Sequence, residues 1–436
     1  MQDAAVLNQL LLGYSPLLDR ERKVVALRLT VFPDRPDATP AGAALLQALQ
    51  TVWPAGEGGA VSLKLDPRPL DPRKPAGRAA SGVWPAVSLN LAGEGLLRSV
   101  LAAQPGPQLM IEVPAFMAAD PSLAADLRRV HAEGSVLLIK GRPTAPLPAE
   151  VLALFSHAIV ESAEDQRIDP APQPGARNIT FVRAGARSPA EIDTAFQQGA
   201  VAVLGWPWDD TPQPPRPPGV RNAVASDVGA VMELIQGVDQ ALPVPQLEAV
   251  LRRDPTLAFR LMRYLNSPAF GLSVEVNSFG HALMLLGYQR LKRWLALLLA
   301  SSGKGPQAPA AMYAAVRRGL LMEELGRDQG LGADSSEVRG EMFICGVFSL
   351  LDRLLQQPMS DLLPSVPVPE RVQQALRGEG DPAGGGPYAP YLALVKAIEH
   401  ESLYDMRELS ESLMLGAGAV NRALLRALLA ARQLDG

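Results

Sequence analysis

The chain has 436 residues, of which 47% are apolar and 20% are charged, and its formal net charge is −4. A length of this size allows two to three domains at about 150 residues each, and the slight negative charge excludes the basic footprint typical of a nucleic-acid-binding domain. A single cysteine, Cys345, excludes an intramolecular disulfide and a cysteine zinc cluster. Its apolar neighbours, Phe343, Ile344 and Phe348, indicate a buried structural thiol.

The sequence carries no targeting signal that we recognise. The N-terminus MQDAAVLNQL has no basic segment ahead of an apolar run, so we expect no signal peptide. No uncharged apolar run approaches the roughly 18 to 20 residues that a membrane-spanning helix needs. We therefore expect a cytoplasmic protein without membrane insertion.

Short apolar strands alternate with amphipathic helices as far as Leu204. Strands are predicted at Lys23–Val31, Ala60–Leu65, Val83–Leu91, Leu109–Val113, Ser135–Ile139, Ala158–Glu161, Ile179–Val182 and Val201–Leu204. Helices are predicted at Ala41–Val52, Gly95–Ala103, Ser122–Glu133, Glu150–Phe155 and Ser188–Gln198. Alternation of this kind is typical of parallel β/α units, and seven or eight strands in about 200 residues favour a short closed barrel over an open sheet.

A proline-rich segment separates this region from the rest of the chain. Asp209–Gly219 reads DDTPQPPRPPG, which is typical of an extended and rather stiff interdomain linker. The sequence therefore predicts three parts: a barrel domain at 1–208, a linker at 209–220 and a helical domain at 221–436.

The most informative stretch of the second half runs from Asp254 to Ser302. Asp254 is a suitable N-cap for a helix that begins at Pro255, and Asn266-Ser267-Pro268 ends that helix. A second helix is expected at Phe279–Leu286, with Gly287 as its left-handed cap. The apolar face of a third helix consists of Leu291, Trp294, Leu295 and Leu298. Because each helix has an apolar face, the three must pack on one another in an all-α domain.

These segments together resemble the HDOD family, an all-α relative of the HD-domain phosphohydrolases that lacks their metal-binding histidines and aspartates. The resemblance covers roughly the last half of the chain. It is carried by RLMRYLNS from Arg260, Ala269-Phe270-Gly271, ALMLLG from Ala282, KRWLA from Lys292, and the later segments Arg317–Asp328, Phe343–Leu355 and Ala375–Asp381.

Metal-dependent hydrolysis of the HD type needs histidines and an adjacent His-Asp pair. The chain has four histidines, His131, His157, His281 and His400, and none of them precedes an aspartate. We therefore predict no metal site in the helical domain.

The first half resembles the EAL domain, a barrel that hydrolyses cyclic di-GMP in bacteria. The segment YSPLLDRERKVVALRLT, Tyr14–Thr30, looks like the start of that family, and EAL–HDOD tandems form a bacterial class with the same domain order. The resemblance implies a (β/α) barrel in which carboxylates and one asparagine hold two divalent cations at the C-terminal strand ends. Such metals clamp the scissile phosphate and lower the pKa of the attacking water.

Most positions of that metal cage do not match. Asn90 in SLN and Glu112 in IEV are retained, whereas Arg28 stands where the namesake glutamate is expected. Ala115 and the pair Lys140-Gly141 stand where further carboxylates are expected. A fixed positive charge at Arg28 would repel a metal ion. The resemblance therefore predicts a degenerate EAL barrel with no catalytic residue, no metal and no cofactor.

The roles of the remaining polar residues stay open at this point. Asn90 and Glu112 are either hydrogen-bond partners at strand ends or the remnant of a working site. Arg28, Lys140 and Arg142 either contact the phosphates of a bound nucleotide or balance charge inside the barrel. A cyclic di-GMP receptor and a residual cyclic di-GMP phosphodiesterase are the alternatives to a barrel without ligand.

The family resemblance implies a non-enzymatic bacterial signal-transduction protein that acts in or near cyclic di-GMP signalling. Its expected partners are other signalling proteins, with cyclic di-GMP as ligand in the receptor alternative and a homodimer as one option. The predicted interaction surface of the HDOD module consists of Arg260, Arg263, Tyr264, Asn266, Arg290, Lys292 and Arg293. The alternative interpretation of these residues is a solvated face of the helices.

Overall fold

The structure, a computed structural model, divides the chain into two compact units. Unit 1 contains Met1–Asp209 and Ala397–Leu425, and unit 2 contains Asp210–Lys396 and Arg426–Gly436. The structure describes residues 5–35, 40–54, 86–107, 109–143, 147–161, 179–208, 226–253, 279–303, 305–327, 336–364, 366, 368–378 and 385–435. The predicted strand at 60–65, the linker at 209–220 and the HDOD segments at 254–278 lie outside these residues.

Unit 1 contains a closed barrel of eight strands that are neighbours in chain order. The strands are β1 (Leu10–Leu18), β2 (Val24–Pro33), β3 (Ala86–Leu91), β4 (Leu109–Pro114), β5 (Val136–Lys140), β6 (Phe155–Glu161), β7 (Phe181–Ala184) and β8 (Ala202–Leu204). Strands β2 to β8 are parallel, whereas β1 is antiparallel to both of its neighbours. The predicted barrel is confirmed.

Strand β1 is the strand of the barrel that sequence reasoning did not find. Its sequence LLLGYSPLL contains Gly13 and Pro16, both of which weaken a strand pattern. It is joined to β2 by a tight turn, in which the Asp19 amide donates to the Lys23 carbonyl over 3.0 Å. No helix lies in this connection, in contrast to a β/α unit.

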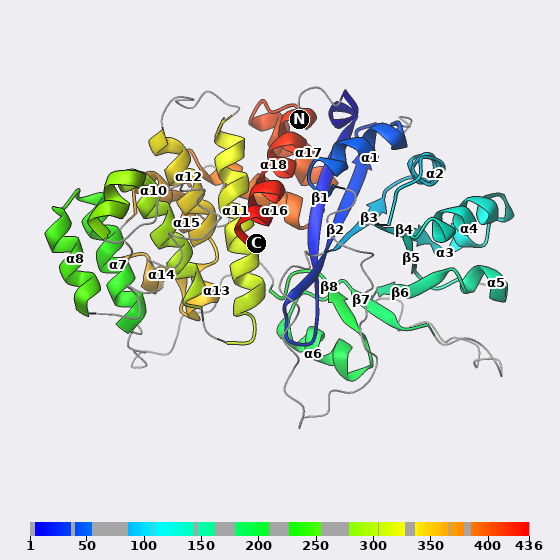
Figure 1. Cartoon of the computed structure of the whole chain (residues 1–436), viewed down its shortest axis with the longest axis horizontal. Helices are drawn as coiled ribbons and strands as arrows, with labels where there is room; N and C mark the ends of the chain where they lie inside the picture. Colours follow the sequence, from blue (N-terminus) through cyan, green and yellow to red (C-terminus); the bar gives the residue numbers. More distant parts are fainter. Residues whose placement is uncertain are drawn as a thin grey trace. The chain divides into compact units, whose positions relative to one another are not determined.

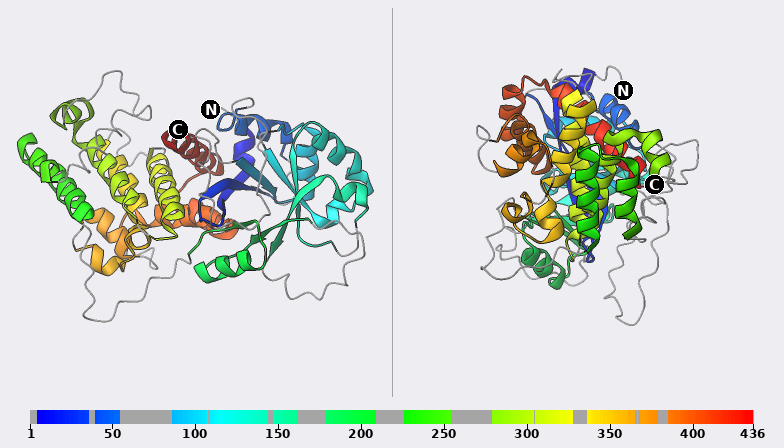
Figure 2. Two further views of the ribbon diagram at one scale, coloured as in Figure 1. Left: turned by 60° about the horizontal axis from the view of Figure 1, so that its bottom comes forward. Right: turned by 90° about the vertical axis from the view of Figure 1, so that its left-hand side faces the viewer.

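The helices that follow the strands lie on the outer side of the ring of strands (Figure 2). They are α1 (Gly42–Gln50), α2 (Glu94–Ala102), α3 (Ala115–Ala118), α4 (Ala124–Ala132), α5 (Ala149–Leu152) and α6 (Pro189–Gln197), with 3₁₀ turns at Ala5–Gln9 and Pro121–Leu123. Helix α6 begins as predicted, because the Ser188 hydroxyl accepts from the Glu191 amide. Helix α5 is shorter than predicted, since Phe155 is a buried residue at the start of β6.

The barrel interior is filled with apolar side chains. Successive strand residues point to opposite faces, so every second residue of a strand faces inward. The inward-facing core consists of Leu17, Ala26, Met110, Leu138, Ile159, Val182, Ala184, Ala202 and Leu204. Arg28, Ser88 and Glu112 share this inward face and are also buried.

The C-terminal segment Ala397–Leu425 belongs to unit 1 as well. It includes α17 (Leu403–Ser412) and the first half of α18 (Ala417–Asp435), which lie beside β1 in Figure 1. The Asn421 side chain donates to the Leu7 and Leu10 carbonyls, each over 2.7 Å. The division of the chain expected from the sequence places this whole segment in the helical domain with 221–436.

The described part of unit 2 is helical. Its helices are α7 (Ser226–Asp239), α8 (Val244–Arg253), α10 (Phe279–Ser301), α11 (Ala308–Arg327), α12 (Ser336–Phe348), α13 (Leu351–Leu355), α14 (Met359–Leu362), α15 (Glu370–Arg377) and the greater part of α16 (Ala389–Glu399). Helix α10 is broken at Gly287, as expected, and the φ of 72° at this residue is one that favours glycine. Cys345 is buried, as predicted.

The predicted fold class, a barrel followed by an all-α region, is confirmed. In the described part of the chain no single helix has both the length and the apolar character that crossing a membrane requires. One bent pair, Leu403–Ser412 with Ala417–Arg432, meets these criteria only when the two helices are taken together.

Candidate functional site

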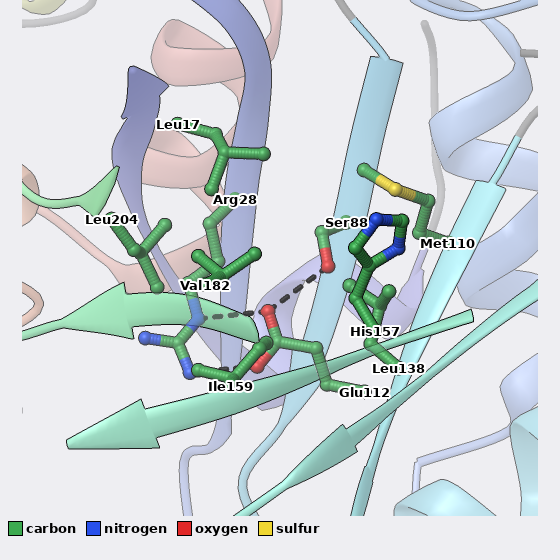
Figure 3. Close-up of a pocket in the computed structure, with 10 residues that line it drawn as sticks. All are labelled: Leu17, Arg28, Ser88, Met110, Glu112, Leu138, His157, Ile159, Val182 and Leu204. Carbon is green, nitrogen blue, oxygen red and sulfur yellow. Dashed lines mark hydrogen bonds and ion pairs between the residues drawn. The ribbon is translucent and has the colours of Figure 1, made fainter. Parts of the chain in front are cut away.

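The polar centre of the barrel is an ion pair between Arg28 on β2 and Glu112 on β4. The guanidinium binds both carboxylate oxygens, with Nε 3.0 Å from Oε1 and Nη2 2.7 Å from Oε2. The Ser88 hydroxyl donates to the same carboxylate over 2.9 Å (Figure 3). Arg28 is 7% exposed and Glu112 is 2% exposed, so the pair is shielded from water. A two-point contact of this kind is the strongest form of an arginine–carboxylate pair.

The local electrostatics keep Arg28 charged. Burial by itself would lower the pKa of the guanidinium, but the neighbouring Glu112 and Glu401 outweigh it and raise that pKa. The carboxylate of Glu112 therefore faces a permanent cation. Of the two carboxylates, Glu112 makes the closer contact.

A second polar group lies at the C-terminal ends of β2, β3 and β5. The Asn90 amide donates to the Thr30 hydroxyl over 3.1 Å and accepts from Lys140 Nζ over 3.0 Å. Burial, together with the positive charge of Arg28, lowers the pKa of Lys140. Arg142 follows beyond the end of β5 and is half-buried. Both retained positions of the EAL pattern, Asn90 and Glu112, are thus hydrogen-bonded to a cationic side chain.

A small cavity lies beside the ion pair. Its volume is about 10 Å³, and its polar lining consists of Arg28, Ser88, Glu112 and His157. A cavity of that size accommodates about one water molecule. Figure 3 shows the imidazole of His157 next to Met110, and burial lowers the pKa of this histidine. This cavity is too small for a nucleotide.

A second carboxylate reaches this site from the C-terminal segment. Glu401 Oε1 accepts from the Ser15 hydroxyl over 2.8 Å, and its Oε2 lies 3.6 Å from Nη1 of Arg28. Ser15 on β1 is paired in register with Arg28 on β2. Sequence reasoning missed Glu401, Ser15 and Ser88. Nothing in the sequence around Glu401 links it to Arg28 or Ser15, which lie more than 370 positions earlier.

The described side chains do not fit a two-metal cage. Hard cations need several oxygen ligands, and Glu112 already gives both of its oxygens to Arg28. Ala115 and Gly141 have no side-chain oxygen, and Lys140 adds a positive charge. Within the residues that the structure describes, no group of three or more His, Cys, Asp or Glu side chains is placed to hold a metal ion.

Only part of the predicted interaction surface falls on described residues. Lys292 is buried and donates to Asp239, and Arg293 pairs with Glu323 and lies 4.3 Å from the ring centre of Phe343. Both are engaged inside unit 2. Outside the described residues or side chains lie Arg260, Arg263, Tyr264, Asn266 and Arg290.

Comparison with known proteins identifies the helical region. Residues 225–355 match the family model of the HDOD domain. The chain contains an HDOD domain. The HDOD match begins after the last strand of the barrel, β8, so the predicted order of a barrel followed by an HDOD domain is confirmed.

Two curated proteins are similar to the chain. It is 25% identical to the uncharacterized protein YuxH of Bacillus subtilis over 244 residues, which are 55% of this chain and 56% of YuxH. It is 27% identical to the cyclic di-GMP phosphodiesterase CdgJ of Vibrio cholerae over 139 residues, which are 32% of this chain and 31% of CdgJ. The chain thus spans little more than half of YuxH and less than a third of CdgJ.

Among solved structures, the chain is similar to the phosphodiesterase PaMucR in its complex with c-di-GMP. The identity is 15% and the TM-score is 0.30, over 45% of this chain and 94% of that one.

Proposed function

We propose that this protein is a non-enzymatic signal-transduction protein in or near cyclic di-GMP signalling. Its EAL-like barrel does not hydrolyse the dinucleotide, and its HDOD domain binds other signalling proteins. The observation that carries the proposal is the buried two-point ion pair between Arg28 and Glu112.

This ion pair opposes metal-dependent hydrolysis for an energetic reason. A divalent cation that used Glu112 as ligand would first have to displace the guanidinium of Arg28. Breaking a buried pair by taking away one partner costs about 3–5 kcal/mol, because the other charge is left buried and uncompensated. Arg28 and Lys140 would also repel the incoming cation. The barrel therefore keeps its fold and loses the site at which water would be activated.

The link to cyclic di-GMP is supported by the domain combination and by relatives. CdgJ is a cyclic di-GMP phosphodiesterase by name, and PaMucR is a phosphodiesterase in complex with c-di-GMP. The family resemblance associates an HDOD domain joined to an EAL-like barrel with regulatory contacts between proteins. We place the output of this protein in those contacts, with other signalling proteins as partners.

One observation favours the receptor alternative. In the described part of the chain, the hydrogen-bond partner of Lys140 Nζ is the neutral amide of Asn90. Burial and Arg28 lower the pKa of Lys140 more than the nearby Glu112, Glu161 and Glu401 raise it, so an added anion near this ammonium would favour its charged form. A phosphate group of cyclic di-GMP at the strand ends, contacted by Lys140 and Arg142, would supply that charge.

The decisive experiment measures turnover and binding in the same preparation. Full-length protein is incubated with cyclic di-GMP and Mg²⁺ or Mn²⁺, and products are separated by chromatography, with Glu112→Gln as matched variant. We expect no linear product from either protein. Turnover that Glu112→Gln abolishes would overturn the proposal. Calorimetric binding without turnover, weakened by Lys140→Met, would establish the receptor alternative.

A further inference from the structure

The C-terminal segment Ala397–Leu425 completes the side of the barrel at β1. Because the turn Asp19–Lys23 joins β1 to β2 without a helix, this strand lacks the cover that a β/α unit provides. The nine residues of β1 are nevertheless all buried. Asn421, which is 0% exposed, donates to the Leu7 and Leu10 carbonyls and accepts from the Leu12 amide over 3.0 Å. The segment therefore packs on β1.

The turn at the beginning of this segment is fixed by a second set of contacts. Glu399 accepts from the Tyr14 hydroxyl over 3.2 Å, and its carbonyl accepts from Trp206 Nε1 over 3.0 Å. The rings of Tyr14 and Trp206 meet edge to face with centroids 5.9 Å apart. These contacts bring Glu401, two residues after Glu399, to the mouth of the barrel.

Glu401 is held in an unfavourable conformation. Its φ is 55°, a left-handed conformation that residues with a Cβ rarely adopt outside specific contacts. Its backbone amide donates to the Ile398 carbonyl over 3.3 Å, and its side chain accepts from Ser15 and faces the charge of Arg28. Its side chain is 15% exposed and lies 3.6 Å from Arg28, whereas Glu112 is buried and binds the same guanidinium at two points. Of the two carboxylates, Glu401 is the one that can leave while Arg28 stays paired.

Gly13 shows that the turn approaches β1 as closely as the backbone permits. A Cβ atom at this position would lie 3.0 Å from the Ile398 carbonyl oxygen and 3.1 Å from Glu401 Cα. Gly13 is paired in register with Thr30, so this missing side chain faces the interior next to Ser15. The close approach needs glycine for its lack of a side chain rather than for its backbone angles.

We propose that Glu401 is a releasable latch that closes the mouth of the barrel over Arg28. In the closed state its carboxylate lies 3.6 Å from Nη1 of Arg28, the guanidinium nitrogen that does not bind Glu112, and its turn covers Gly13. In the open state Ser15, Nη1 of Arg28 and the surface of β1 are uncovered. The segment follows Lys396 of unit 2 directly in the chain, so the latch is the covalent continuation of the helical region.

The latch does not rest on the proposed function, since it operates whether or not the barrel binds or cleaves a nucleotide. Its two states differ in the protection of backbone amides in Ala397–Leu425 and β1. Native-state hydrogen exchange, followed by mass spectrometry on the full-length protein, reports such local opening.

Two variants open the latch by different physical means. Glu401→Gln keeps the size and the acceptor for Ser15 but removes the charge, and Gly13→Ala places a methyl group against the turn. Glu408→Gln, at an exposed position of α17, makes the same chemical change away from the barrel mouth and serves as control. We expect Glu401→Gln and Gly13→Ala to increase exchange in both segments about tenfold, which corresponds to about 1.4 kcal/mol of opening free energy, with β4 to β6 unchanged.

The result that would overturn the latch is equally specific. If Glu401→Gln exchanges at the rate of wild type and of Glu408→Gln, the carboxylate holds nothing closed. If exchange rises uniformly through β4 to β6 as well, Glu401 supports the whole fold rather than a separate opening.

Discussion

Arg28 carries a full positive charge into an interior that consists mainly of apolar side chains, and its environment compensates that charge. Glu112 binds it at two points, Glu401 adds a weaker contact, and Ser88 donates to Glu112. Buried charges of this kind are tolerated only when they are paired and hydrogen-bonded. The stability of the barrel therefore depends on the match between Arg28 and Glu112.

Loss of one partner of this pair is expected to be costly. Arg28→Met leaves Glu112 buried without its cation and should lower the free energy of unfolding by about 3–5 kcal/mol. The double variant Arg28→Met with Glu112→Met removes both charges and should recover most of this loss. Arg98→Ala, which breaks a partly exposed pair with Asp120, serves as control and should have a much smaller effect. Denaturant unfolding checks the series, and an Arg28→Met variant as stable as wild type would contradict the account.

His157 makes the stability of the barrel depend on pH. Burial lowers its pKa below the usual value of 6.5. The unfolded chain therefore binds a proton at a higher pH than the folded one, and stability falls as pH decreases through about 6.5. We expect the melting temperature of wild type to fall more steeply from about pH 7 to about pH 5 than that of His157→Gln.

The matched control for this pH series is His131→Gln, because His131 is exposed on α4. Its melting temperature should follow wild type throughout. Equal slopes for wild type and His157→Gln would show that protonation of His157 does not limit stability.

Some of the site residues were predictable from local sequence. Asn90, Glu112 and Lys140 lie at or near the ends of predicted parallel strands, and such ends meet at one edge of a barrel. The resemblance to the EAL family, together with these strand ends, predicts that the three residues share one site. It could not show that Arg28 reaches Glu112, since that depends on the closure of the ring and on side-chain length.

At the level of elements, prediction succeeded where one periodicity dominates. The alternation of apolar strands with amphipathic helices predicts β2 to β8 and the helices α1, α2, α4, α5 and α6, but not the short helix α3. The strand also expected at 60–65 lies outside the described residues. It fails at β1, where Gly13 and Pro16 interrupt the pattern and an antiparallel pairing replaces the β/α repeat. It succeeds again at Gly287, because a glycine after an apolar helical run is a stop signal.

Helices α11 and α12 pack so closely that their contact requires glycine. A Cβ atom on Gly346 would lie 2.6 Å from the carbonyl carbon and oxygen of Arg318. Gly346→Ala should therefore lower the free energy of unfolding by at least about 2 kcal/mol, since a backbone group has to move. Gly229→Ala on α7, where an added Cβ meets nothing, should raise it by about 0.5–1 kcal/mol. Thermal unfolding of both variants checks this contrast. Equal effects of the two substitutions on stability would contradict it.

At the level of the whole molecule, unit 1 is assembled from two stretches that are remote in sequence. Asn421 bonds to Leu12 across 409 positions. No local pattern predicts such a contact, because the amphipathic sequences of α17 and α18 do not identify the surface on which these helices pack. The sequence division at 208 and 221 follows the proline-rich segment and cannot detect a later return of the chain to the barrel.

This return has a measurable energetic contribution. Asn421→Ala leaves two buried carbonyls and one buried amide of the N-terminal region without their partner, and each unsatisfied buried group costs about 1–3 kcal/mol. We expect a loss of at least about 2 kcal/mol in the free energy of unfolding, together with faster hydrogen exchange in β1. A loss below about 0.5 kcal/mol, the range of ordinary surface substitutions, would mean that the segment contributes little to the barrel.

The most direct test of the central claim is a titration of Mn²⁺ into the full-length protein, followed by electron paramagnetic resonance of the free ion. If Glu112 is held by Arg28, wild type and Glu112→Gln should give the same titration curve, even at millimolar Mn²⁺. Saturable binding in wild type that Glu112→Gln abolishes would show that the carboxylate is available to a metal ion. That result would contradict the assignment of the barrel as non-enzymatic.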